Sequence, residues 1–339
     1  MTAGERDPRL EWRRVALGGV LALLVGAGVV VLIGRAAGFS KLSATLRGSE
    51  PEWLAVCAAG QLVVFAGYAG VYRAAVRFER GPSIGMRLSL RVVLASFGLT
   101  QLVAAGGAAA LAVTYWALRR VGFARRDALV RLIGLNTFVY LVFGLIGLGA
   151  GVAALAVGEA PLPMTLSWIV LIPILLLAAR WFTAPRRIER WARDTGGWLR
   201  RGLALGVSAA WWVRRAVGTP DGRALAPWAL CYWVGDIASL WGGLRAFGVQ
   251  IGLAALVLAY ATGYLAQSVP LPFVATGGVD AATTFALTAV GVPLEQALLG
   301  VVAHRVFAFW IPLVPGLILA ALLPATGRRL EQAATARSG

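Results

Sequence analysis

Residues 129–156 read LVRLIGLNTFVYLVFGLIGLGAGVAALA, a continuous apolar run whose only charged side chain is Arg131, near its start. About 20 apolar residues suffice for a helix to cross a hydrocarbon core about 30 Å thick. Lipid offers the backbone no hydrogen-bond partners, so a span is either a helix or part of a closed barrel. Barrel strands are short and alternate in polarity, which this run does not. The run therefore predicts a transmembrane α-helix.

The whole chain of 339 residues has this character. It is 59% hydrophobic and 14% charged, whereas a soluble domain carries about 25% charged residues. We therefore predict an all-α polytopic membrane protein. Six full spans are expected, at about 15–34, 53–76, 129–156, 164–183, 224–244 and 296–323.

Two further apolar segments, about 90–118 and 251–291, are interrupted by glycine pairs, and the second also contains Pro270 and Pro272. Broken helices at membrane depth are tolerated where they are buried in protein or line a cavity. We predict that each segment forms a broken or re-entrant helical hairpin. The glycines of these hairpins serve either close helix approach or a hinge; they are Gly106, Gly107, Gly277 and Gly278.

The basic residues set the expected orientation. The net charge is +17, and all basic residues except Lys41 are arginine. These arginines lie between apolar runs, which favours orientation in the bilayer and contact with anionic lipid over nucleic-acid binding. We expect both termini on the cytoplasmic side of a plasma membrane. The arginine-rich stretches expected there are the N-terminal arm, 73–91, 119–131, 186–223 and the C-terminal tail.

Within the most basic stretch, tryptophans alternate with arginines: Trp191, Trp198, Trp211 and Trp212. This composition predicts either a helix lying in the cytoplasmic interface, attracted to anionic lipid, or a basic anchor that only fixes topology.

The two halves of the chain resemble each other. Residues 121–130 read VGFARRDALV and residues 290–299 read VGVPLEQALL, an offset of 290 − 121 = 169. Apart from chance similarity in an Ala/Leu/Gly-rich chain, this indicates inverted repeats, an arrangement typical of transporters that alternate access around a midplane site. The predicted organisation is a cytoplasmic arm (1–14), a first membrane repeat (15–157), a second membrane repeat (158–325) with a basic interfacial segment (184–223), and a cytoplasmic tail (326–339).

Several motifs of the second half carry a family resemblance: Pro270-Leu271-Pro272, Gly277-Gly278-Val279-Asp280, Gly291-Val292-Pro293, His304-Arg305-Val306-Phe307 and Trp310-Ile311-Pro312. With them, the chain from about 15 to 325 resembles the lysylphosphatidylglycerol synthase transmembrane (flippase-like) family. That resemblance implies a translocase for aminoacylated or related lipids, without the aminoacyl transfer, which belongs to a separate soluble domain. Many members continue Gly-Gly-Leu-Gly and then glutamate, whereas here Asp280 follows Gly277-Gly278-Val279.

Charged residues at membrane depth are the first candidates for a lipid headgroup site, because they are costly there and usually face a cavity or a partner. Arg305 offers a planar guanidinium that binds a phosphodiester, or it forms a salt bridge with Asp236 or Asp280. Asp236 either contributes to the site or pairs with an arginine as a strut. Asp280 either senses a cationic headgroup or caps a half-helix.

The remaining candidates are polar. His304 is the only histidine, so packing or hydrogen bonding is its default role and no metal site is expected. Gln101 and Gln267 each precede a glycine pair, where they bind a headgroup or satisfy unwound backbone. We expect Cys57 and Cys231 to be buried apolar fillers.

These features favour an integral membrane lipid translocase that moves an anionic or aminoacylated phospholipid, or a related lipid, between leaflets through a midplane cavity. No Walker loop is present, and no cofactor or enzymatic activity is expected. The alternatives are a membrane-embedded enzyme and a scaffold for a lipid-modifying enzyme, in lipid or lipid-linked glycan metabolism.

Overall fold

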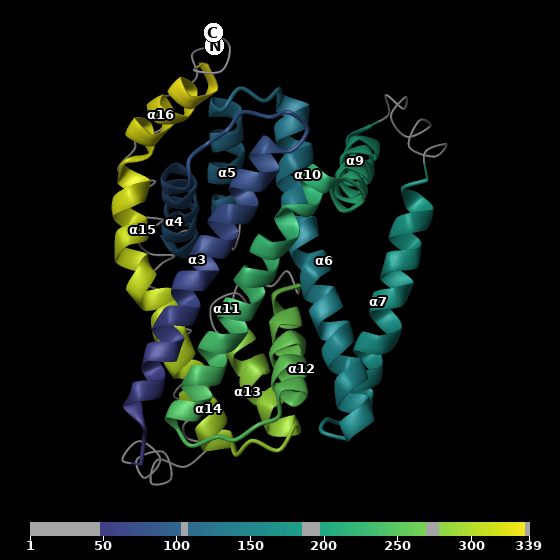
Figure 1. Ribbon diagram of the computed structural model, residues 1–339, viewed down its shortest axis with the longest axis vertical. Helices are drawn as coiled ribbons and strands as arrows, with labels where there is room; N and C mark the ends of the chain where they lie inside the picture. Colours follow the sequence, from purple (N-terminus) through teal and green to yellow (C-terminus); the bar gives the residue numbers. More distant parts are fainter. Residues whose placement is uncertain (1–47, 103–107, 185–196, 269–277, 336–339) are drawn as a thin grey trace.

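The computed structural model describes four stretches of the chain, 48–102, 108–184, 197–268 and 278–335 (Figure 1). Every regular element within them is a helix. Some predictions fall outside these stretches: the first span at 15–34 and the glycines Gly106, Gly107 and Gly277.

Five long helical stretches coincide with the predicted spans inside the described chain. They are η1–α3 (Pro51–Trp53 and Leu54–Arg77), α6 (Arg125–Val157), α7 (Leu162–Phe182), α11 (Leu225–Ala246), and the last stretch, α14 (Leu294–Arg305), η4 (Val306–Trp310) and α15 (Ile311–Ala321). All except α11 are long and apolar enough to cross a membrane by length and composition. α11 carries the charged side chains Asp236 and Arg245.

The two interrupted segments each hold a pair of short helices. The first pair is α4 (Met86–Leu102) and α5 (Ala108–Arg120); the second is α12 (Leu253–Tyr264), extended by η2 (Leu265–Ser268), and α13 (Val279–Ala289). The helices of each pair pack against each other. The α4–α5 pair lies in the upper half of the molecule and the α12–α13 pair in the lower half (Figure 1). The two pairs therefore occupy opposite ends of the helical bundle.

Within the described part of the chain, the most extensive helix packing joins α3 to α11, one from each half of the sequence. A Cβ atom added to Gly60 would lie 2.5 Å from the carbonyl oxygen of Gly235, and one added to Gly67 would lie 2.6 Å from the backbone nitrogen of Tyr232. Small residues permit such backbone approach between membrane helices, where packing drives association. Because Gly60 meets Gly235 while Gly67 meets Tyr232, the two helices run antiparallel.

The same turn occurs twice, 169 residues apart. Gly122 and Gly291 both adopt a positive φ, +104° and +94°, in the region that glycine enters without strain. The amide of Phe123 donates to the carbonyl oxygen of Leu118 (3.3 Å), as that of Val292 does to Leu287 (3.1 Å). The motifs matched in the sequence thus fold into the same local structure.

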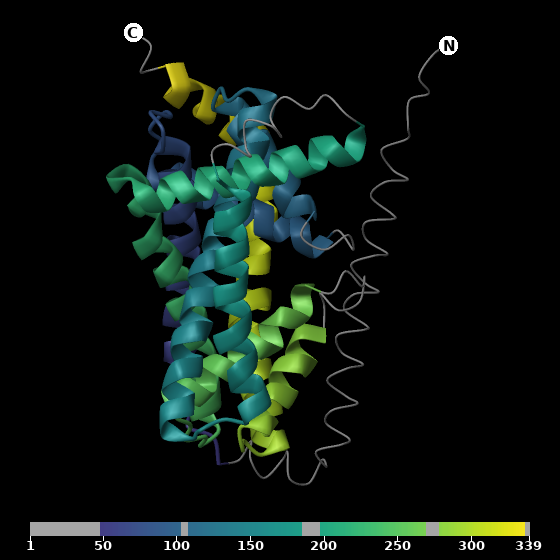
Figure 2. The ribbon, with the colours of Figure 1, turned by 90° about the vertical axis from the view of Figure 1, so that its right-hand side faces the viewer.

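Arginine-rich segments gather at one end. α3 and α5 end there, α6 begins there, and α9 (Trp198–Gly218), α10 (Pro220–Arg223) and α16 (Leu323–Thr335) lie there (Figure 1). α9 lies across the bundle, roughly perpendicular to the long helices (Figure 2). The turn after α6 and the turn after α11 lie at the opposite end.

One expectation needs correction. Cys231 is exposed and not buried, since it lies on a face of α11 that no other helix of the described stretches covers, and a thiol is compatible with lipid there. Trp212, on the basic stretch, is buried with its ring against Gly134 and Phe78, because α9 turns that side chain toward the bundle. The C-terminal segment is helical as far as Thr335, where α16 ends.

Candidate functional site

A cluster of polar side chains lies at mid-depth between helices from both halves. Asp236 is 236 − 225 = 11 residues from the start of α11. His304 and Arg305 lie at a similar distance from the start of α14. At 1.5 Å per residue, 11 residues span about 16 Å, half of a hydrocarbon core about 30 Å thick.

Asp236 is the centre of this cluster. The amide Nε2 of Gln61, from α3, donates to its Oδ1 at 2.9 Å. The hydroxyl of Tyr260, from α12, donates to its Oδ2 at 2.5 Å. Nε2 of His304 lies 3.7 Å from Oδ1, and the His304 and Asp236 side chains are each 13% exposed. Side chains from α3, α12 and α14 thus meet the carboxylate of α11. A charged group at membrane depth usually has such polar partners, because it is costly without them.

The sole histidine connects α14 to α11 through both ring nitrogens. Its Nδ1 lies 3.1 Å from Oγ of Ser239, so the ring is held between that hydroxyl and the Asp236 carboxylate. Neutral imidazole donates from one nitrogen and accepts at the other, whereas the protonated ring donates from both. The carbonyl oxygen of Ser239 also accepts from the buried thiol of Cys57 at 3.0 Å.

The next residue along the chain forms a separate ion pair. Nε of Arg305 lies 3.3 Å from Oδ2 of Asp280, and the two side chains are 29% and 22% exposed. The Arg305 guanidinium also lies over the ring of Phe309, 5.0 Å from its centroid. Asp280 belongs to the first turn of α13, where the helix dipole favours a carboxylate.

The helix changes its winding directly after Arg305. Residues Val306–Trp310 form the π-helical segment η4 between α14 and α15. Single π-helical turns within α-helices occur frequently at functional sites. The Arg305–Asp280 pair therefore joins a half-helix N-terminus to an irregular point of a long helix.

The contacts of Arg305 and Asp236 can be compared with the alternatives that the sequence left open. Arg305 pairs with Asp280, one of the two expected carboxylates. Asp236 lies beside His304, whereas an arginine partner was one of the two alternatives for this carboxylate. Successive residues point about 100° apart around a helix, so His304 faces α11 while Arg305 faces α13.

For the remaining candidates from the sequence, the structure gives the position of the backbone only. Gln101 lies in the last turn of α4 and Gln267 in η2, and their side chains are outside the described part of the chain. Gly278 directly precedes α13 with helical dihedrals. Gln61 and Tyr260 were missed: Gln61 had a signal, as an amide in the middle of an apolar span, but nothing in the sequence sets Tyr260 apart.

Aromatic rings border the cluster. The rings of Phe143 and Trp233 stack with centroids 4.2 Å apart, and Tyr260 and Tyr264 pack beside them. The indole N–H of Trp233 donates to the carbonyl oxygen of Val139 at 2.8 Å. This packing fixes the wall next to Asp236.

The cluster has no charged counterpart in the first half. At the offset of 169, Arg305 corresponds to Asn136 (305 − 169 = 136) and Asp236 to Gly67 (236 − 169 = 67). Oδ1 of Asn136 accepts from the hydroxyl of Tyr68 at 3.3 Å. The charges of this site therefore come from the second half.

Two surface pockets lie away from this cluster. One, of about 280 Å³, is near Glu159, Gln250 and Gln296 at the end opposite α9. The other, of about 370 Å³, lies between α5 and the α15–α16 corner and is lined by Trp116 and Arg120. Neither of these two is lined by the mid-depth cluster, so the midplane cavity stays a prediction.

Lipid-compatible surface surrounds the bundle: α7, for example, exposes Val170, Ile174 and Leu177. The acidic and basic side chains of the mid-depth cluster are paired, His304 with Asp236 and Arg305 with Asp280. A helical protein with an apolar exterior and paired charges at mid-depth is a polytopic membrane protein. The family model described as "Lysylphosphatidylglycerol synthase TM region" matches residues 19–316, and the chain belongs to that family. The resemblance seen in the motifs is thereby confirmed. A search of curated proteins finds no match.

Proposed function

We propose that this protein is a lipid translocase that moves an anionic or aminoacylated phospholipid between the leaflets of the plasma membrane. Membership of the family relates the chain to membrane lipid metabolism or translocation. The arginine-rich end with α9 and α16 is the cytoplasmic side, in keeping with the excess of Lys and Arg in cytoplasmic loops.

The observation that carries the proposal is the Arg305–Asp280 pair. Its two groups are the complements of a headgroup that contains both a phosphate and an ammonium. A guanidinium binds phosphate through two parallel hydrogen bonds, and a carboxylate pairs with an ammonium. When such a headgroup binds, the ion pair between Arg305 and Asp280 is replaced by two ion pairs with the headgroup. Neither side chain is then left without a partner at membrane depth.

The arrangement of the halves supports an alternating-access path. At the offset of 169, α3 corresponds to α11, the α4–α5 pair to α12–α13, and α6 to α14–α15. The two hairpins approach from opposite ends of the bundle (Figure 1). We propose that the halves are inverted repeats that open the Asp236 and Arg305 cluster to each leaflet in turn. This movement breaks no covalent bond and calls for neither a catalytic residue nor a cofactor.

Reconstitution tests this proposal. Purified protein in liposomes is supplied with fluorescently labelled phosphatidylcholine, phosphatidylglycerol and lysylphosphatidylglycerol, and a membrane-impermeant reductant reports which leaflet holds the label. We expect the anionic or aminoacylated lipid to cross faster than in protein-free vesicles. Equal rates in both kinds of vesicle, for all three lipids, would refute the proposal.

A double variant tests the site. D280N with R305Q removes both charges of the pair together, so no single charge is left buried without a partner. We expect transport to fall about tenfold, which corresponds to roughly 1.4 kcal/mol of lost headgroup binding. R125Q is the matched control, since Arg125 is exposed at the start of α6, and its rate should equal that of the unchanged protein.

A further inference from the structure

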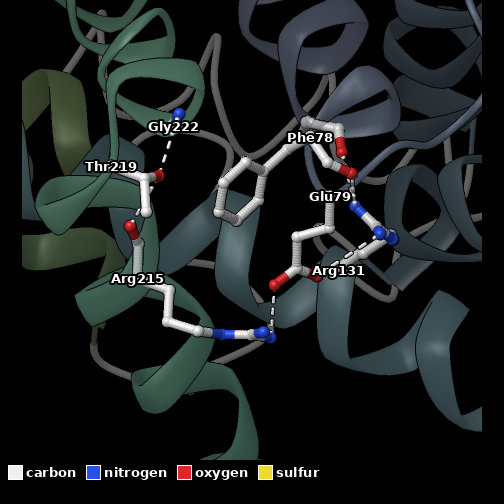
Figure 3. A network of polar contacts seen from close by, with 7 residues as sticks. Phe78, Glu79, Arg131, Arg215, Thr219 and Gly222 are labelled. Atoms are coloured by element: carbon white, nitrogen blue, oxygen red, sulfur yellow. Dashed lines mark hydrogen bonds and ion pairs between the residues drawn. The ribbon is translucent and has the colours of Figure 1, made fainter.

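A second polar network lies at the arginine-rich end and does not belong to the mid-depth site (Figure 3). Glu79, just after α3, is shared between two arginines. Its Oε2 lies 3.4 Å from Nη2 of Arg131 on α6, and its Oε1 pairs closely with Nη2 of Arg215 on α9. One carboxylate thus joins three helices.

The two arginines differ in how firmly they are held. The Arg131 side chain is 8% exposed and donates to the carbonyl oxygens of Ala75 (2.8 Å) and Phe78 (2.9 Å). Its guanidinium also lies over the ring of Phe123. The Arg215 side chain is 45% exposed. Arg215 is therefore the partner that an external anion can reach.

The Glu79 turn holds conformational strain. Glu79 and Arg80 both have φ of 58°, a left-handed conformation that residues other than glycine rarely adopt. Such positions persist only where the surroundings impose them. The ion pairs of Glu79 help to hold this backbone conformation. Loss of one of them therefore weakens the restraint on the turn.

α9 has the geometry of a helix at a membrane surface. One face is buried, through Ala209, Trp212, Val213 and Ala216. The other exposes two pairs of arginines, together with the apolar side chains of Leu203 and Val217. The helix lies across the spanning helices (Figure 2). Exposed basic and apolar residues on one transverse helix fit the boundary between headgroups and acyl chains.

The charges around the C-terminal half of α9 do not balance. Arg131, Arg214 and Arg215 contribute +3, and the two carboxylates that interact with Arg131, Glu79 and Asp127, contribute −2, which leaves +1. Arg214 donates to a neutral acceptor, the carbonyl oxygen of Thr183, at 3.1 Å. An anionic headgroup complements this surplus.

We propose that the exposed face of α9 binds anionic phospholipid headgroups of the adjoining leaflet, and that a headgroup phosphate competes with Glu79 for Arg215. Occupancy of the site then loosens the turn at Glu79 between α3 and α4. The site lies at the membrane surface, away from the mid-depth cluster, and its existence does not depend on whether the protein transports lipid.

The preference of the protein for phosphatidylglycerol over phosphatidylcholine tests whether the exposed face of α9 binds anionic headgroups. Electron paramagnetic resonance of spin-labelled phosphatidylglycerol and phosphatidylcholine measures the ratio of their association constants in phosphatidylcholine bilayers. R214Q/R215Q should lower the preference for phosphatidylglycerol by about fivefold for each arginine at the surface. R125Q/R126Q removes another exposed pair at the same end. If binding is local to α9, this control should lower the preference much less than R214Q/R215Q does. Equal loss in both double variants would show diffuse attraction and overturn the proposal, as would an unchanged preference in R214Q/R215Q.

Hydrogen–deuterium exchange tests the competition. In an equal mixture of the two lipids, the turn at Glu79 should exchange faster than in phosphatidylcholine alone. E79Q removes the competing carboxylate, so it should retain the phosphatidylglycerol preference and lose this lipid-dependent change in exchange. A lipid effect of the same size in E79Q, or none in the unchanged protein, would contradict the competition.

Discussion

Replacing Asp236 by alanine tests whether the mid-depth cluster is a closed network. The change leaves the amide of Gln61 and the hydroxyl of Tyr260 without their acceptor. An unpaired buried group costs about 1–3 kcal/mol in general, but interhelical hydrogen bonds in membranes average about 0.6 and reach about 1.7 kcal/mol. Because the cluster lies at membrane depth, the lower scale applies, and two such bonds give a loss of about 1–3 kcal/mol.

The measurement is unfolding of the purified protein in mixed micelles of increasing dodecyl sulfate content, followed by circular dichroism. D236N keeps an oxygen acceptor, so it should lose less than D236A. D127A is the matched control, because Asp127 is exposed in the first turn of α6. If D236A were no less stable than D127A, or more stable than the unchanged protein, the buried carboxylate would destabilise the fold. The hydrogen bonds of Asp236 would then not hold these helices together.

Further substitutions test the helix contacts. R131A leaves two buried carbonyl oxygens without their donor and should lower the unfolding free energy by about 1–3 kcal/mol for each. R125A, at an exposed site, should cost about 0.5 kcal/mol or less. Equal unfolding free energies for the two variants would contradict the anchoring role of Arg131. G60A places a Cβ atom 2.5 Å from the carbonyl oxygen of Gly235 and should cost about 1–3 kcal/mol by overpacking. In G149A the added Cβ atom meets no atom of the described residues within 4 Å, so this variant should be neutral or stabilising by up to about 1 kcal/mol. A G60A variant as stable as the unchanged protein would mean that α3 and α11 do not pack this closely.

Hydropathy and local motifs predicted much of the architecture, because these properties are local. An apolar run long enough to span lipid must be helical, so the helix positions followed from length and composition. The ten-residue match predicted that residues 121–130 and 290–299 are related, and both segments form the same turn, because a positive φ and a local hydrogen-bond pattern depend on few neighbours.

The partners of individual side chains could not be predicted in the same way. Whether Asp236 meets an arginine or a histidine depends on the rotation of α14 against α11, which hydropathy does not fix. The burial of Trp212 depends on Gly134 across the gap between α9 and α6, a contact between residues far apart in the chain. The shared role of Glu79 likewise requires three helices to meet at one end.

Where a lipid headgroup lies inside the protein is the direct test of the proposed function. A phospholipid that carries a photoreactive diazirine on its headgroup is incorporated with the protein into liposomes, irradiated, and mapped by mass spectrometry of the peptides. The proposal predicts labelling of α13 and α14 near Asp280 and Arg305, which an excess of the unmodified lipid should abolish. Labelling confined to the two ends of the bundle, with none on these helices, would contradict it.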